Sequence, residues 1–320
     1  MIKSYAKVTQ IFVVLAGVLG GMIWWQRSKH SPSKVYTIGI LQTASHPALD
    51  AAREGFVSYL KEALPNQIEF ITKNVQGDVA QAYSVAKSFN QSPAINGLFA
   101  IATLTAQAAV QTQTDKPIAI AAVTDPVEHG IWKPGGLVCG ASDRVDIYKQ
   151  IELMHLLFPS LARVGLLFTL SEPNSVSLVD EMKRALEEEQ IEVVEFGIAT
   201  ASDLPLIVAR IKEVDLVWVP TDNGVATALD MVTKSLQQAN IPLIVSFDIS
   251  PGVFAAAGID YKKSGVQAAQ CLEKVLIQGQ KPSDIPILHP LIDYFVVNKK
   301  MAEERGIVER LSESKSIIWF

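Results

Sequence analysis

The chain has 320 residues, 49% of them hydrophobic, and a formal net charge of −5. This length allows two ordinary domains, each with its own core. The slightly acidic balance, with no basic stripe interleaved with aromatics, excludes the electrostatic footprint of a nucleic-acid-binding protein. The two cysteines lie in apolar contexts, which favours buried thiols, although a single disulfide is arithmetically possible.

An apolar segment near the N-terminus, Val8–Trp25, follows Lys3 and Lys7. As a helix it would span about 27 Å at ~1.5 Å per residue, close to the ~30 Å hydrocarbon core of a bilayer. We therefore expect residues 1–30 to be a signal peptide or a membrane anchor. No cleavage site stands out and the tryptophans suit a membrane interface, so we favour an uncleaved anchor. A polar linker, 31–34, follows.

The first part of the body alternates β-rich apolar runs with amphipathic helices. The opening run, Val35–Leu41, is typical of a strand buried on both faces of a parallel sheet. Asp78 is expected to cap a helix whose apolar residues recur every three or four positions. Further strands are predicted over Ile68–Ile71, Gly97–Ile101 and Ile118–Val123. We expect residues 35–140 to form one α/β lobe.

The segment His129–Ser142 interrupts this alternation with turn residues and is interpreted as a crossover between lobes. Strands alternate with helices again afterwards, which predicts a second parallel sheet with right-handed crossovers. The expected organisation is a second lobe over 141–250, a return to the first lobe over 251–290, and a C-terminal strand and helix on the side of the second lobe over 291–320.

One structural phrase occurs twice, in residues 97–125 and again in residues 215–248. Each copy runs apolar strand, threonine, helix, proline, apolar strand and a final aspartate, Asp125 or Asp248. Open parallel sheets bind ligands at the carboxyl ends of their strands, where these polar residues fall. The sequence therefore predicts two doubly wound α/β lobes with parallel sheets and a ligand cleft between them.

No catalytic or metal-binding pattern is recognisable. The five histidines are scattered without an i, i+4 pair, and there is neither a G-x-S-x-G elbow nor a Walker A loop. We therefore expect no enzymatic activity, no metal and no cofactor.

Hydrogen-bonding residues follow several predicted strands directly. Helices beginning at positions such as Thr103 and Asp222 would aim free backbone N–H groups at the cleft, which favours a carboxylate. Three aspartates, Asp125, Asp222 and Asp248, would meet an ammonium. The combination suits a zwitterion such as an amino acid, with Phe247 as an aromatic contact. Ser, Thr, Asn and Asp are also preferred helix N-caps, and capping remains the alternative role for each polar residue.

Seven phrases occur in order along the body: IGILQTASHPALDAAREGF, NVQGD, AVTDPVEHG, PGG…GAS, VGLLFTLSEPNS, PTDNGV and AAAGIDYKKSGVQAA. Together they resemble the substrate-binding components of ABC uptake transporters with the type I periplasmic-binding-protein fold, in the branch with tryptophan or aromatic amino-acid binding members. The resemblance covers about Val35 to Gly306. It implies a ligand held between the lobes by Gln42, His46, Thr103, Thr105 and Asp125 on one side and by Ser171, Asn174, Ser175, Asp222, Asn223 and Asp248 on the other.

The resemblance implies a monomer that captures a small solute, an aromatic amino acid being the best candidate, and presents it to an ABC permease with its ATPase subunits. The expected location is periplasmic or otherwise extracytoplasmic, at the inner membrane if residues 8–25 stay in place. Many family members are lipoproteins, but this chain lacks the lipid-accepting cysteine. The alternative function is an extracytoplasmic sensor domain that signals to a membrane receptor.

Overall fold

The computed structural model describes residues 35–320 except 113–114, 212, 248, 257–258 and 291–293. The predicted membrane segment, the linker and Asp248 lie outside the described residues. Within the described part of the chain, no helix is both long enough and apolar enough to cross a membrane.

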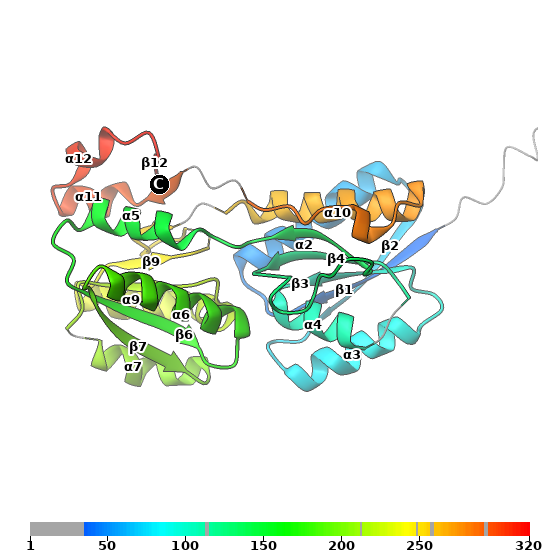
Figure 1. Ribbon diagram of the computed structural model, residues 1–320, viewed down its shortest axis with the longest axis horizontal. Coiled ribbons are helices and arrows are strands. Elements are labelled where there is room, and N and C mark those ends of the chain that lie inside the picture. Colours follow the sequence, from blue (N-terminus) through cyan, green and yellow to red (C-terminus); the bar gives the residue numbers. More distant parts are fainter. Residues whose placement is uncertain (1–34, 113–114, 212, 248, 257–258, 291–293) are drawn as a thin grey trace, which may run out of the picture. The chain divides into compact units, whose positions relative to one another are not determined.

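The first lobe is built on a five-stranded sheet in the order β2-β1-β3-β4-β5. Its neighbours β1, β3, β4 and β5 run parallel. Helices α2 and α10 cover one face of this sheet, and α3 and α4 cover the other (Figure 1). The strands are β1 (Tyr36–Gln42), β2 (Ile68–Asn74), β3 (Gly97–Ile101), β4 (Ile118–Val123) and β5 (Val138–Ser142). The helices are α2 (Pro47–Ala63), α3 (Val79–Gln91), α4 (Thr103–Gln111), α10 (Tyr261–Gln278) and the short 3₁₀ turn η2 (Pro282–Asp284).

Strand β3 shows why the sheet is covered on both sides. All five of its residues are buried, because successive side chains point to opposite faces and both faces meet helices. Phe99 and Ile101 join the apolar cluster under α2 and α10, whereas Leu98 and Ala100 join the cluster of α3 and α4. The ring of Phe99 stacks on Phe56 of α2 with the centroids 3.8 Å apart.

The second lobe is built on a seven-stranded sheet in the order β12-β11-β10-β9-β8-β6-β7. All neighbouring strands run parallel except β10 and β11, which are antiparallel. The strands are β6 (Arg163–Thr169), β7 (Glu192–Ile198), β8 (Leu216–Val219), β9 (Leu243–Val245), β10 (Ala255–Ala256), β11 (Phe295–Val297) and β12 (Ile317–Trp319). The helices are α5 (Ile147–Leu157), α6 (Pro173–Glu188), η1 (Ala201–Asp203), α7 (Leu204–Arg210), α8 (Asn223–Thr227), α9 (Leu229–Gln238), α11 (Lys299–Glu304) and α12 (Val308–Ser312). The prediction of two α/β lobes with parallel sheets is confirmed, with one antiparallel exception.

The connections between the sheets differ from the sequence-based expectation in two places. Residues 138–142, inside the expected crossover, form β5, which pairs with β4 through Ser142. The chain therefore stays in the first sheet two residues beyond the expected boundary at residue 140. Strand β10 pairs with β9, so the second sheet extends beyond residue 251. Short apolar runs in sequence do not show whether they continue a sheet or connect two sheets, because only pairing with a neighbouring strand decides this.

Candidate functional site

A cavity of about 310 Å³ lies where the strand-end loops of the two sheets meet. This volume falls at the lower end of the ~300–1,000 Å³ range of small-molecule pockets. The first lobe contributes loops after β1, β2 and β3, and the second contributes loops after β6, β7 and β8. The lining residues are Thr43, Ala44, Gln76, Gly77, Val79 and Leu104 from the first lobe, and Thr169, Ser171, Glu172, Pro173, Asn174, Ala199, Thr200, Asn223, Gly224 and Thr227 from the second.

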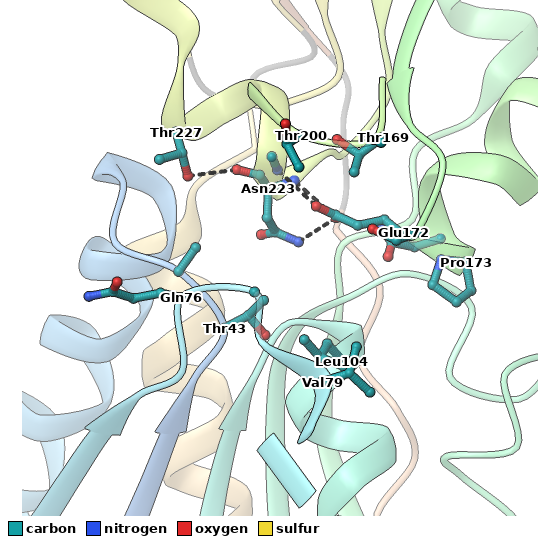
Figure 2. Close-up of a pocket in the computed structure, with 16 residues that line it drawn as sticks. Thr43, Gln76, Val79, Leu104, Thr169, Glu172, Pro173, Thr200, Asn223 and Thr227 are labelled. Carbon is teal, nitrogen blue, oxygen red and sulfur yellow. Dashed lines mark hydrogen bonds between the residues drawn. The ribbon is translucent and has the colours of Figure 1, made fainter. Parts of the chain in front are cut away.

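The cavity wall combines an apolar region with a single carboxylate. Figure 2 shows Val79 and Leu104 side by side on the first lobe, with Glu172 and Asn223 on the second. Among the described residues that line the cavity, Glu172 is the only one with an ionisable side chain, and none is aromatic. The cavity is therefore suited to a ligand with a positive group and an apolar body.

The wall formed by α4 depends on an unusual backbone conformation. Ala102, the N-cap residue of this helix, has φ 78° and ψ 163°, in a region that is almost restricted to glycine and costs about 1–3 kcal/mol. No side chain caps α4, and the buried hydroxyl of Thr103 has no hydrogen-bond partner among the described residues. The first turn of α4, which carries Leu104 into the cavity wall, therefore keeps uncapped backbone N–H groups.

Three N–H donors hold the carboxylate of Glu172 in place. Its Oε2 accepts hydrogen bonds from the backbone N–H of Asn223 at 3.0 Å and from its Nδ2 at 2.7 Å, while Oε1 accepts from the backbone N–H of Gly224 at 2.8 Å. A Cβ at position 224 would lie 2.4 Å from Oγ1 of Thr169, so glycine allows α8 to start this close to β6. Glu172, Asn223 and Gly224 thus determine where the carboxylate and its hydrogen-bond donors lie.

A second carboxylate, Asp222, lies near Glu172 and also accepts three hydrogen bonds. It caps α8 by accepting from the backbone N–H of Val225 at 2.7 Å, and it accepts from the backbone N–H and Oγ1 of Thr169 at 2.6 and 2.8 Å. Burial raises the pKa of Asp222, and these donors oppose the rise. Burial and the nearby Asp222 also raise the pKa of Glu172 above its usual value.

Several contacts join the two lobes beside the cavity. His46 Nε2 lies 3.2 Å from Oδ1 of Asn223, and the hydroxyls of Thr124 and Thr221 lie 2.9 Å apart. Burial lowers the pKa of His46, which favours the neutral imidazole. Arg144, in the connection after β5, forms ion pairs with Asp125 and, at 2.6 Å, with Glu181 of α6.

Six of the residues expected at the site lie at the cavity or directly beside it. Ser171, Asn174 and Asn223 line the cavity itself. His46, Asp222 and Phe247 line a space of about 10 Å³ next to it, which is too small for an amino acid.

Five other expected residues do not line the cavity. They are buried with partners in the protein, apart from the Thr103 hydroxyl. The Thr105 hydroxyl donates to the carbonyl oxygen of Ile101 at 2.8 Å, and Ser175 donates to that of Thr221 at 3.2 Å. These five residues are Gln42, Thr103, Thr105, Asp125 and Ser175.

Sequence reasoning missed Glu172 and the apolar lining residues Val79 and Leu104. Glu172 lies between the selected Ser171 and Asn174, in the loop directly after β6. Its position as an ionisable residue in a strand-end loop could have identified it as a ligand contact. The prediction instead chose the aspartates of the repeated phrase for this role. Val79 and Leu104 gave no signal, because each reads as an ordinary helical residue.

A family model for ABC transporter substrate binding proteins matches residues 37–315. The chain belongs to this family. The curated "Tyrosine-binding protein" of Clostridioides difficile (strain R20291) is 36% identical over 309 residues, which are 90% of this chain and 88% of that protein. This substrate-binding protein belongs to the branch with aromatic amino-acid binding members, as the sequence predicted.

Two solved structures carry the comparison further. The ABC domain in complex with L-Trp from Streptococcus pneumonia has a TM-score of 0.81 at 30% identity and covers 89% of this chain and 100% of that one. The ligand-free, open structure of a substrate-binding protein with adhesive properties from Clostridium difficile has a TM-score of 0.66 at 33% identity, with 89% and 99% covered. Members of the family bind solutes outside the cytoplasm and are not enzymes, which agrees with the expected location and absence of catalysis.

Proposed function

We propose that this substrate-binding protein captures an aromatic amino acid in the cavity between its lobes and presents it to an ABC permease. The observation that carries the proposal is the cavity itself, which lies at the strand ends of both sheets and combines apolar side chains with one carboxylate. The L-Trp complex and the tyrosine-binding relative support an aromatic ligand. Since none of the described residues that line the cavity is aromatic, the ring would pack on aliphatic groups such as Val79 and Leu104.

The polar contacts of the ligand are also part of the proposal. The uncapped first turn of α4 would receive the ligand carboxylate, because free N–H groups at a helix N-terminus attract anions. Ser171 and Asn174 lie in the opposite wall and would contact the polar end of the ligand. Asp248 stays a candidate contact from the sequence.

Closure of the lobes around the ligand is a further element of the proposed function. By TM-score the structure is more similar to the L-Trp complex (0.81) than to the open, ligand-free relative (0.66). Its sequence identity to the open protein is nevertheless slightly higher, at 33% against 30%. This difference supports a closed arrangement, which the ligand would stabilise by bridging both walls. We also propose that residues 8–25 keep the protein at the membrane beside the permease.

A thermal-shift screen of the full-length protein tests the proposal. L-Tyrosine or L-tryptophan should raise the unfolding temperature more than other amino acids, because a ligand of the native state alone stabilises it. Replacing Leu104 with tryptophan should fill part of the cavity and abolish this shift. The matched control, Leu206→Trp, changes an exposed residue on α7 and should respond like the wild type. If no aromatic amino acid shifts the wild type, the proposed ligand class is wrong.

A further inference from the structure

We propose that Glu172 binds the ammonium group of the ligand and restricts the cavity to molecules with a free amine. This inference rests on the proposed capture of an amino acid and identifies the residue that would select for it. Glu172 lines the cavity, comes from the loop between β6 and α6, and is turned toward Asn223 in Figure 2.

The carboxylate of Glu172 is held in place by the protein itself. Three hydrogen bonds from Asn223 and Gly224 engage both oxygens, so the side chain does not have to be ordered when the ligand binds. Each carboxylate oxygen has two lone pairs, and from the described residues Oε1 accepts only the bond from Gly224, so it can accept another hydrogen bond from an ammonium. Fixing a charged group before binding lowers the entropic cost of the contact.

Glu172 also sets the charge of the described cavity lining. Among the lining residues that the structure describes there is no lysine or arginine, and Glu172 is the only one with an ionisable side chain. A ligand with an ammonium would pair with this carboxylate, whereas a purely anionic ligand would meet no cationic side chain among the described lining residues. The cavity therefore discriminates between amino acids and the corresponding carboxylates that lack the amine.

The two other described carboxylates expected to meet an ammonium lie outside the cavity lining. Asp222 accepts three hydrogen bonds from Thr169 and Val225, and Asp125 forms an ion pair with Arg144. The burial of Glu172 next to Asp222 also raises its pKa, and an ammonium would reverse that effect by favouring the ionised carboxylate.

Glu172 has a competing role as a cap for the start of α8, because it accepts from two backbone N–H groups there. A purely structural cap would affect every ligand of the cavity equally. An ammonium partner would affect only ligands that carry the amine. The two roles are therefore separated by changing the ligand and the protein together.

The experiment compares L-tyrosine with 3-(4-hydroxyphenyl)propionate, which keeps the ring and carboxylate but lacks the amine. Calorimetric titrations use the full-length wild type, Glu172→Gln and the matched control Glu188→Gln, an exposed residue at the end of α6. We expect Glu172→Gln to weaken tyrosine binding at least about thirtyfold, which is typical for loss of one partner of a buried charge pair. The same variant should bind the propionate as well as or better than the wild type, and Glu188→Gln should bind both ligands normally.

Two results would overturn the inference while leaving the proposed function intact. One is wild-type affinity for tyrosine in Glu172→Gln. The other is an equal loss of affinity for tyrosine and the propionate, which would show that Glu172 acts only as a cap. If tyrosine and tryptophan do not bind to the wild type, the same titrations use whichever amino acid stabilises it. Weaker binding of that amino acid by Glu172→Gln would support the inference, and only the proposed preference for aromatic side chains would be rejected. A wild type that binds no amine at all would reject both.

Discussion

Asp143 gives the most direct test of the electrostatics at the connection between the lobes. This aspartate follows β5, is 3% exposed, and accepts hydrogen bonds from the hydroxyls of Thr124 at 2.7 Å and Tyr261 at 3.3 Å. Burial raises its pKa from 3.8 to about 6, because the two hydroxyl donors do not fully replace the water lost by the charged form. The variant Asp143→Asn removes the ionisation while keeping the shape and one acceptor oxygen.

The sign and size of the effect follow from the pKa values of the folded and unfolded states. Since the folded pKa lies above the unfolded value, the folded protein binds more protons in this range, and its stability rises as the pH falls through 6. At ~1.36 kcal/mol per pH unit, lowering the pH from 7.5 to 4.5 should stabilise the wild type by about 2 kcal/mol through this residue. Asp143→Asn lacks this contribution.

Urea unfolding at pH 7.5 and pH 4.5 measures the free energy of unfolding of both proteins. The fluorescence of the buried Trp218 is one reporter of unfolding. The difference in unfolding free energy between wild type and Asp143→Asn should shift by about 2 kcal/mol in favour of the wild type at pH 4.5. The control Asp146→Asn changes the exposed N-cap of α5, where asparagine caps as well as aspartate, and should follow the wild type. A difference that is the same at both pH values would refute the reasoning.

Two further variants test how the helices and lobes pack. Gly265→Ala would place a Cβ 1.9 Å from the carbonyl oxygen of Ala52, which would force α10 away from α2 at a cost of about 1–3 kcal/mol. Calorimetry should show a lower unfolding temperature, whereas Gly97→Ala, with its nearest atom 3.4 Å away, should change little. Arg144→Met removes the ion pairs to Asp125 and Glu181, which join the lobes. It should weaken ligand binding by less than tenfold, because the Arg144 side chain is 31% exposed and water screens its ion pairs. Arg163→Met, which breaks ion pairs within the second lobe only, should bind ligand like the wild type; equal losses in both variants would argue against a role for Arg144 in closure.

The local pattern of the sequence was sufficient to predict most of the secondary structure. Asp78 caps α3 by accepting from the backbone N–H of Gln81, as its position before an amphipathic stretch predicted. The repeated phrase located β3, β4, β8 and β9. In its second copy the single expected helix is divided into α8 and α9, with Asp222 as the N-cap of the first. Periodicity gives no warning of this break, because the apolar positions continue through it.

The sequence also showed polar residues directly after the predicted strands. The parallel topology brings those strand ends to one cavity. The sequence alone did not decide which of them face the ligand. Asp222 and Asp125 look equivalent to Glu172 in sequence, yet they accept bonds from Thr169 and Arg144 and lie outside the cavity lining. Contacts with residues more than 15 positions away in the chain hold Asp222 and Asp125 outside the cavity lining, whereas Glu172 lies in it, and only the tertiary structure determines this difference.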